Sequence, residues 1–124
     1  MVFSYWSQNS SILDFEIERG ADGAMTGYAY PEMLVEVHRR FVAGDLDGAE
    51  DLYDAHLPLL KHEQVPGFGL LVRKEILRRR GAIASAKVRP PGGQMVAADL
   101  AELDRLIRRL ERRLAEPKLI KAVA

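Results

Sequence analysis

The sequence predicts a single, mostly helical domain with two short strands near its N-terminus. The chain has 124 residues, which suffice for one domain with a core of its own. From Pro31 onward, apolar residues recur three and four positions apart, which is the period of helices that pack through one face. Before Pro31, the apolar stretches are short and are separated by glycines and polar residues, a pattern typical of strands and turns.

The first 30 residues contain two expected strands and an ambiguous segment between them. Met1–Trp6 is apolar and aromatic and is followed by a polar run, and Ala24–Gly27 is a short apolar stretch of small residues. Between them, Ser11–Arg19 alternates apolar and acidic residues, and this period favours a strand. A serine three positions before an aspartate, and Gly20 directly after the segment, are instead typical of the two ends of a helix.

Two helices are expected between Pro31 and a Pro-Gly break at residues 65–69. Pro31 fits the first position of the first helix, which Gly44 ends. Asp45 or Asp47 can cap the second helix, and Pro58 inside it predicts a kink. The apolar face of the first helix should comprise Leu34, Val37, His38, Phe41 and Val42. The stripe of the second should comprise Ala49, Leu52, Tyr53, His56, Leu59 and Leu60.

Two further helices are expected in the second half of the chain. The third spans Leu70–Arg80 and ends at Gly81, and residues 82–95 form an irregular connection. In the last helix, Asp99 and Glu102 form a possible capping pair, and the chain is expected to fray from residue 117. The apolar positions of that helix are Leu100, Leu103, Ile107, Leu110 and Leu114.

The formal net charge is zero, but the two halves of the chain are oppositely charged. Residues 1–66 carry 12 acidic and 4 basic residues, a net of −8, and residues 67–124 carry 6 and 14, a net of +8. A basic half can mark a surface for nucleic acid or anionic lipid. We favour pairing of the two halves, within one chain or between copies, because no aromatic residues interleave the arginines. We therefore expect no nucleic-acid partner.

No membrane partner is expected either, because no apolar run approaches the roughly 20 residues of a membrane span. The chain begins without the basic start and long apolar stretch of a secretory signal, and it contains no cysteine. A chain without cysteine has neither disulfides nor thiol catalysis and suits a reducing compartment. We expect a soluble, cytoplasmic protein.

The sequence carries no motif for a metal, a nucleotide or a catalytic nucleophile. The three histidines, 18 and 6 residues apart, match no metal-ligand spacing, and no glycine-rich phosphate loop or G-x-S-x-G elbow is present. An imine-forming lysine needs an apolar site that lowers its pKa, whereas all five lysines have polar or charged neighbours. The residues alone therefore predict no cofactor, no metal and no catalytic residue.

Several runs, in order and spacing, resemble the C-terminal part of one enzyme family. They are residues 13–15, 20–27 and 31–32, the helix–Gly–helix joint at 41–49, and the tracts 59–69 and 70–77. Together they cover about residues 11–114 and resemble the dihydrodipicolinate synthase and N-acetylneuraminate lyase family. Members of that family are (β/α)₈-barrel enzymes, class I aldolases, lyases or dehydratases, which bind pyruvate or another 2-keto acid as a Schiff base.

The resemblance implies an α/β fold, the C-terminal portion of a TIM barrel plus C-terminal helices. Val2–Trp6 would be the seventh barrel strand, Ser11–Arg19 the helix after it, and Gly23–Gly27 the eighth strand. Ser7 and Met25 would then lie at strand carboxyl ends, where barrel enzymes hold their substrates, and are the two candidate substrate-binding residues. The chain is interpreted as one partial domain, with residues 1–30 from the barrel, helices over 31–115 and a tail at 116–124.

The departures from the family bear on activity. A complete barrel needs about 250 residues. In the family, the imine-forming lysine, the catalytic tyrosine and the carboxylate-binding turn lie on strands that precede this segment. The run from Tyr28 to Pro31 fits the family's Tyr-x-x-Pro pattern only by coincidence, because it follows the last strand. We therefore expect a lyase segment that is inactive alone, or alternatively a non-enzymatic helical interaction module derived from that fold. A homo-oligomer, or a partner chain that supplies the missing strands, is expected, and a small 2-keto acid would bind only to a completed barrel.

Overall fold

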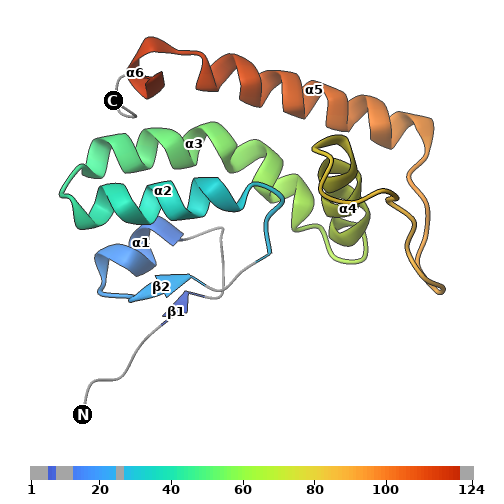
Figure 1. Ribbon diagram of the computed structural model, residues 1–124, viewed down its shortest axis with the longest axis horizontal. Helices are drawn as coiled ribbons and strands as arrows, with labels where there is room; N and C mark the ends of the chain where they lie inside the picture. Colours follow the sequence, from blue (N-terminus) through green and yellow to red (C-terminus); the bar gives the residue numbers. More distant parts are fainter. Residues whose placement is uncertain (1–5, 8–12, 25–26, 121–124) are drawn as a thin grey trace.

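The computed structural model describes residues 6–7, 13–24 and 27–120. In this part of the chain, two very short strands are followed by a mainly helical body (Figure 1). The order of elements is β1 (Trp6–Ser7), α1 (Leu13–Glu18), β2 (Gly23–Ala24), α2 (Pro31–Val42), α3 (Leu46–Glu63), α4 (Gly69–Arg79), α5 (Ala97–Leu114) and α6 (Pro117–Ile120).

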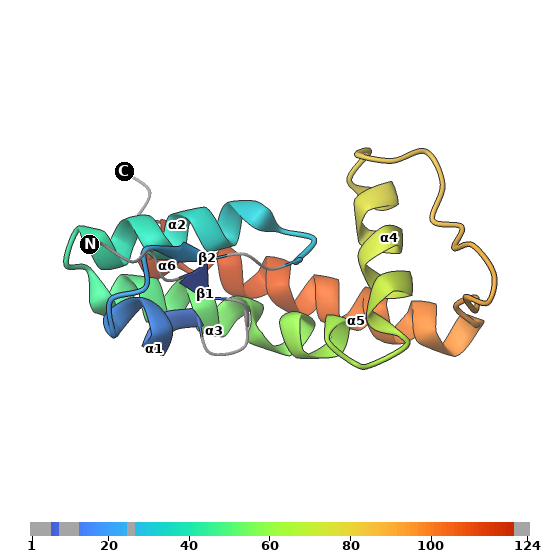
Figure 2. The ribbon, with the colours of Figure 1, turned by 90° about the horizontal axis from the view of Figure 1, so that it is seen from below.

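The elements are arranged in layers around the pair α2 and α3. The strands and α1 lie on one side of this pair, and α5 lies on the other side (Figure 1). Figure 2 shows α4 standing crosswise to α5, beyond the far end of α3. The sheet and α5 are thus separated by a helical layer, so that surfaces on them face in different directions.

The two strands run parallel, with Trp6 opposite Gly23 and Ser7 opposite Ala24, and α1 connects them. A parallel pair needs a crossover, which is usually a helix. The strand that periodicity favours over Ser11–Arg19 is therefore wrong for the described part of that segment, and the helix that the family resemblance implies is correct. Residues 1–5 of the first expected strand, and residues 25 and 26 of the second, lie outside the described residues.

The hydrophobic core lies mainly among the helices, and the expected stripe of α3 is confirmed. All six of its residues are buried, including His56, and α3 continues through Pro58. The face of α2 differs from the expected one, because Met33, Val37 and Arg40 are buried whereas Val42 is 74% exposed. Because arginine is polar, the spacing of apolar residues does not indicate that position 40 belongs to the buried face.

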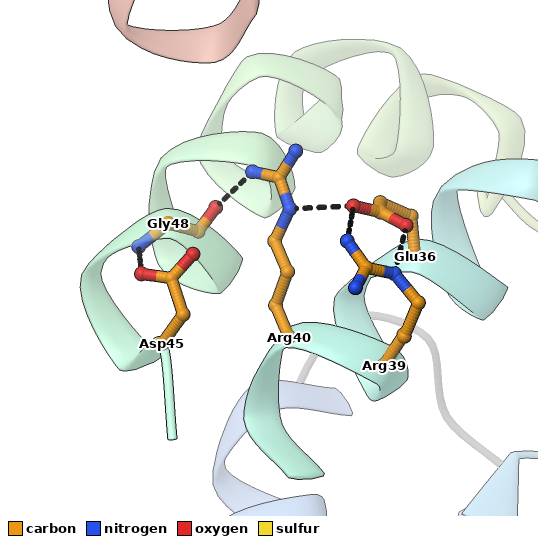
Figure 3. Close-up of polar contacts among 5 residues, drawn as sticks. All are labelled: Glu36, Arg39, Arg40, Asp45 and Gly48. Carbon is orange, nitrogen blue, oxygen red and sulfur yellow. Dashed lines mark hydrogen bonds and ion pairs between the residues drawn. The ribbon is translucent and has the colours of Figure 1, made fainter. Parts of the chain in front are cut away.

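Arg40 fixes the joint between α2 and α3 (Figure 3). Although it is only 2% exposed, it donates to the backbone oxygen of Gly48 at 2.7 Å and to Oε1 of Glu36 at 2.8 Å. Hydrogen bonds from Arg39 and Arg40 lower the pKa of Glu36 to about 2, so that the carboxylate stays ionised. Of the two expected caps, Asp45 is the one that serves, accepting from the Gly48 amide at 3.0 Å.

The last two helices begin and end differently from the expectations. At the start of α5, Oδ2 of Asp99 accepts from the Val96 amide at 2.8 Å, so the cap lies one turn earlier than the expected pair with Glu102. Fraying was expected from residue 117, whereas Pro117–Ile120 form α6 with Leu119 only 3% exposed. None of the described helices is both long and apolar enough to cross a membrane.

Candidate functional site at the carboxyl edge of the strands

Because β1 and β2 are parallel, their carboxyl ends meet at one edge of the sheet. Ser7 is the last residue of β1 and lies opposite Ala24, the last residue of β2. Ser7 is therefore at the edge where the resemblance implies that it should be. Met25, the other candidate, follows Ala24 directly and lies outside the described residues. The roles of both residues in binding substrate remain proposals.

The segment Gly27–Tyr30, which leads away from this edge to α2, is held by two polar side chains of α3. The hydroxyl of Tyr28 lies 2.8 Å from Nδ1 of His56, and both side chains are buried. The amide of Ala29 donates to Oε2 of Glu63 at 3.1 Å. Glu63 is only 1% exposed.

Two arginines of the α4 region complete the contacts with this segment. Arg73 donates through Nε to Oε1 of Glu63 at 2.7 Å, and its guanidinium packs so closely on Gly27 that a Cβ there would lie 2.7 Å from Nη1. Arg80 donates to the backbone oxygen of Ala29, and its Cζ lies 4.4 Å from the centre of the Tyr30 ring. We refer to Tyr28, His56, Glu63, Arg73 and Arg80 as the clamp.

The charge states of the clamp suit it for positioning rather than for proton transfer. Burial lowers the pKa of His56 to about 4, so that its imidazole is neutral at neutral pH and can accept the phenol's hydrogen bond. Burial, together with the charge of Glu63, raises the pKa of Tyr28 far above its usual value. Burial also raises the pKa of Glu63, against the opposing effect of Arg73. Neither His56 nor Tyr28 is therefore poised to exchange a proton near pH 7.

The described residues hold neither an evident nucleophile nor a metal centre. No lysine among them is buried, as a lysine with a lowered pKa would need to be. No group of three or more His, Cys, Asp or Glu residues in the described ranges is placed to hold a metal ion.

Sequence reasoning missed the clamp. The spacing of residues places His56 in an apolar stripe, and Tyr28 stands out only as a member of a coincidental motif. A signal was present, because His56 and Glu63 lie seven residues apart on the buried side of one helix, and buried polar side chains need partners. The identity of those partners, 28 and 34 residues away, was not evident from that spacing.

No family model matches the chain, but individual proteins do. It is 35% identical over 96 residues to L-2-keto-3-deoxyarabonate dehydratase of Azospirillum brasilense, a match that covers 77% of this chain and 31% of that enzyme. The structure of dihydrodipicolinate synthase from Rhodopseudomonas palustris is 47% identical with a TM-score of 0.84, covering 86% of this chain and 36% of the synthase.

A more distant structure shows the same fold. It is the 4-hydroxy-tetrahydrodipicolinate synthase of Methylacidiphilum fumariolicum SolV, which is 21% identical with a TM-score of 0.78 over 97% of this chain and 39% of that one. The chain spans about a third of the length of the relatives that it matches. In sequence and in fold it resembles the C-terminal part of the dihydrodipicolinate synthase family, a portion of a TIM barrel with its C-terminal helices.

Proposed function

We propose that the chain is the C-terminal segment of a dihydrodipicolinate synthase-like lyase that acts on pyruvate or another 2-keto acid through a Schiff base. The observation that carries this proposal is the 47% identity at a TM-score of 0.84 to a synthase. The dehydratase relative supports the substrate class, because its name specifies a 2-keto acid.

In a completed barrel, β1 and β2 would be the last two strands, and the clamp would hold the segment that leaves their carboxyl edge. TIM-barrel enzymes bind their substrates at that edge. Ser7 and Met25 would contribute to the pocket for the keto acid. The lysine that condenses with the keto group, with loss of water, and the tyrosine that assists it would come from strands outside this chain. The chain alone would therefore be inactive.

The proposal includes a partner, either further copies of the chain or a chain that supplies the remaining strands. Phe15 on α1 is 61% exposed, and Val35 and Val42 on α2 are 69% and 74% exposed. Large apolar side chains in such positions favour association, because burying them removes apolar surface from water.

A second candidate is a helical interaction module without catalytic activity. The observation that favours it is the core itself, which is built mainly from residues of α2, α3, α4, α5 and α6 and excludes water from Val37, Val72 and Leu103 without a barrel. In this case the chain would bind a partner through its helices and would contribute to no imine chemistry.

One experiment distinguishes the two. The chain is incubated with pyruvate and borohydride, alone and together with the Rhodopseudomonas palustris synthase truncated by its matching C-terminal part, and intact masses are measured. We expect no adduct on the chain alone, and an adduct on the truncated synthase that requires the chain. The truncated synthase alone and the full-length synthase are the negative and positive controls.

Each result assigns a function. An adduct on the chain alone would disprove its inactivity and would identify a lysine that geometry does not single out. A complex that co-elutes without forming an adduct would favour the helical module over the lyase segment.

A further inference from the structure

The outward face of α5 carries four arginines within two helical turns. They are Arg105, Arg108, Arg109 and Arg112, and all four are exposed, whereas Leu103 and Leu110 are the buried residues of the same helix. Residues spaced by three, four and seven positions lie on one side of a helix. The four guanidinium groups therefore form one strip along α5.

These arginines differ from the other arginines near them. Arg79 pairs with Asp104 at 2.5 Å, and Arg113 pairs with Glu116 at 3.0 Å. Within the described ranges, the four arginines of the strip form no ion pair or hydrogen bond with the protein. Four like charges that are not engaged in ion pairs attract anions.

The strip lines a groove of about 490 Å³ together with His62, Glu102 and Leu106. Its lining thus contains four guanidinium groups and one carboxylate. The ring of His62 packs edge-on against Phe68 at 5.4 Å, and its Nε2 is buried without a hydrogen-bond partner in the described protein. A buried polar atom without a partner is an unusual feature, and it belongs to a residue that lines the same groove.

We propose that this groove binds a small oxyanion with several charged groups, of the polyphosphate or polycarboxylate class. Guanidinium groups bind phosphate and carboxylate through paired hydrogen bonds, and the volume lies within the usual range for small-molecule sites. From Arg105 to Arg112 the helix rises about 10 Å, so one phosphate reaches only part of the strip. His62 supplies a further hydrogen-bonding atom once the flexible arginine side chains turn toward a ligand.

This site is independent of the proposed lyase function. The arginine strip lies on α5, whereas the strands lie on the other side of the pair α2 and α3 (Figure 1). The groove comes near the clamp only at His62, which directly precedes Glu63 on α3. A nucleic acid is a less suitable ligand, because neither the strip nor His62 and Glu102 provide a Phe, Tyr or Trp on which bases stack. Nucleic-acid binding is therefore used as a contrary outcome of the test.

The test is isothermal titration calorimetry of the chain with phosphate, pyrophosphate, tripolyphosphate and citrate at matched ionic strength. Affinity should rise with the number of charged groups, and comparison of tripolyphosphate with citrate separates phosphate from carboxylate ligands. Replacing both Arg105→Gln and Arg109→Gln should weaken tripolyphosphate binding by about tenfold or more. Arg89→Gln, an exposed arginine outside the groove, is the charge control and should change affinity less than about twofold.

A second measurement does not depend on affinity. In a proton NMR titration with tripolyphosphate, the ring resonances of His62 should shift, whereas those of His38, on α2, should not. The proposal is overturned if the double variant binds like the unmodified chain, or if Arg89→Gln weakens binding equally. It is also overturned if His62 does not respond, or if duplex DNA binds more tightly than tripolyphosphate with a steep dependence on salt.

Discussion

The hydroxyl of Tyr28 lies 2.8 Å from Nδ1 of His56, and this buried contact ties the segment after β2 to the middle of α3. The two rings also meet edge to face, with centroids 5.6 Å apart. The candidate site is therefore supported by a helix that lies outside the strand pair.

Removing the hydroxyl in Tyr28→Phe should lower the free energy of unfolding by about 1–3 kcal/mol, because Nδ1 of His56 loses its partner in a buried place. Tyr30→Phe removes the same atom from a neighbouring, half-buried ring that keeps its contact with Arg80. This control should cost less than about 0.5 kcal/mol. Urea unfolding at pH 7 measures both, and equal losses would contradict the importance of the contact.

The low pKa of His56 predicts a specific dependence of stability on pH. Between pH 6.5 and about 4 the unfolded chain binds a proton at this imidazole and the folded chain does not. The free energy of unfolding contributed by His56 is complete above pH 6.5 and falls by about 3 kcal/mol as the pH decreases to about 4.

The raised pKa of Glu63 acts in the opposite direction, because above pH 4.5 the folded carboxyl retains its proton longer than the unfolded one. The measurement is therefore the difference in the free energy of unfolding between the unmodified chain and His56→Gln, obtained from urea titrations between pH 4.5 and 7.5. The glutamine can still accept from Tyr28 but does not titrate, and Glu63 is common to both proteins. If the free energies of unfolding of the two proteins depended on pH in the same way, the fold would not hold His56 neutral.

Breaking the pair of Glu63 and Arg73 should be costly. In Arg73→Ala, the Ala29 amide is the one partner that Glu63 keeps among the described residues. We expect a loss of about 2–4 kcal/mol in the free energy of unfolding. Arg78→Ala removes an exposed arginine from Glu75, which retains Arg79, and should cost less than about 1 kcal/mol. Adding Glu63→Gln to Arg73→Ala should recover part of the loss, and a double variant less stable than Arg73→Ala would contradict a burial penalty.

A close backbone approach predicts a strong effect at Gly69, the first residue of α4. A Cβ there would lie 1.9 Å from the backbone oxygen of Glu63, so that Gly69→Ala must displace the start of α4. We expect a loss of about 2–3 kcal/mol in thermal or urea unfolding. Gly93→Ala is the matched control, because its Cβ would meet Leu71 at an ordinary 3.9 Å. Similar free energies of unfolding for the two variants would contradict the close contact between Gly69 and the backbone of Glu63.

The helical part of the fold could largely be predicted from the sequence, because helices that pack through one face have regularly spaced apolar residues. All six expected stripe residues of α3 are buried. This spacing is misleading where a polar residue is buried, as at Arg40. It is also misleading where a short crossover helix has the alternating pattern of a strand, as in α1. In α1 the alternating Phe15 is 61% exposed and Ile17 is 8% exposed, so the alternation marks no single buried face.

The candidate site could be predicted from the sequence only in part. The position of Ser7 at the carboxyl edge followed from the family resemblance, since a two-residue strand carries almost no pattern of its own. The clamp could not be predicted, because its hydrogen bonds join residues far apart in the sequence, and spacing along a chain does not specify such partners.

The short joint of residues 43–45, braced by Arg40, has a consequence for the order in which the chain folds. Helices connected by so few residues meet with little loss of loop entropy, whereas β1 and β2 pair only after α1 has crossed between them. We therefore expect the hairpin of α2 and α3 to form before the strands pair. In that order of events, the strand edge is completed last, on a helical surface that has already assembled.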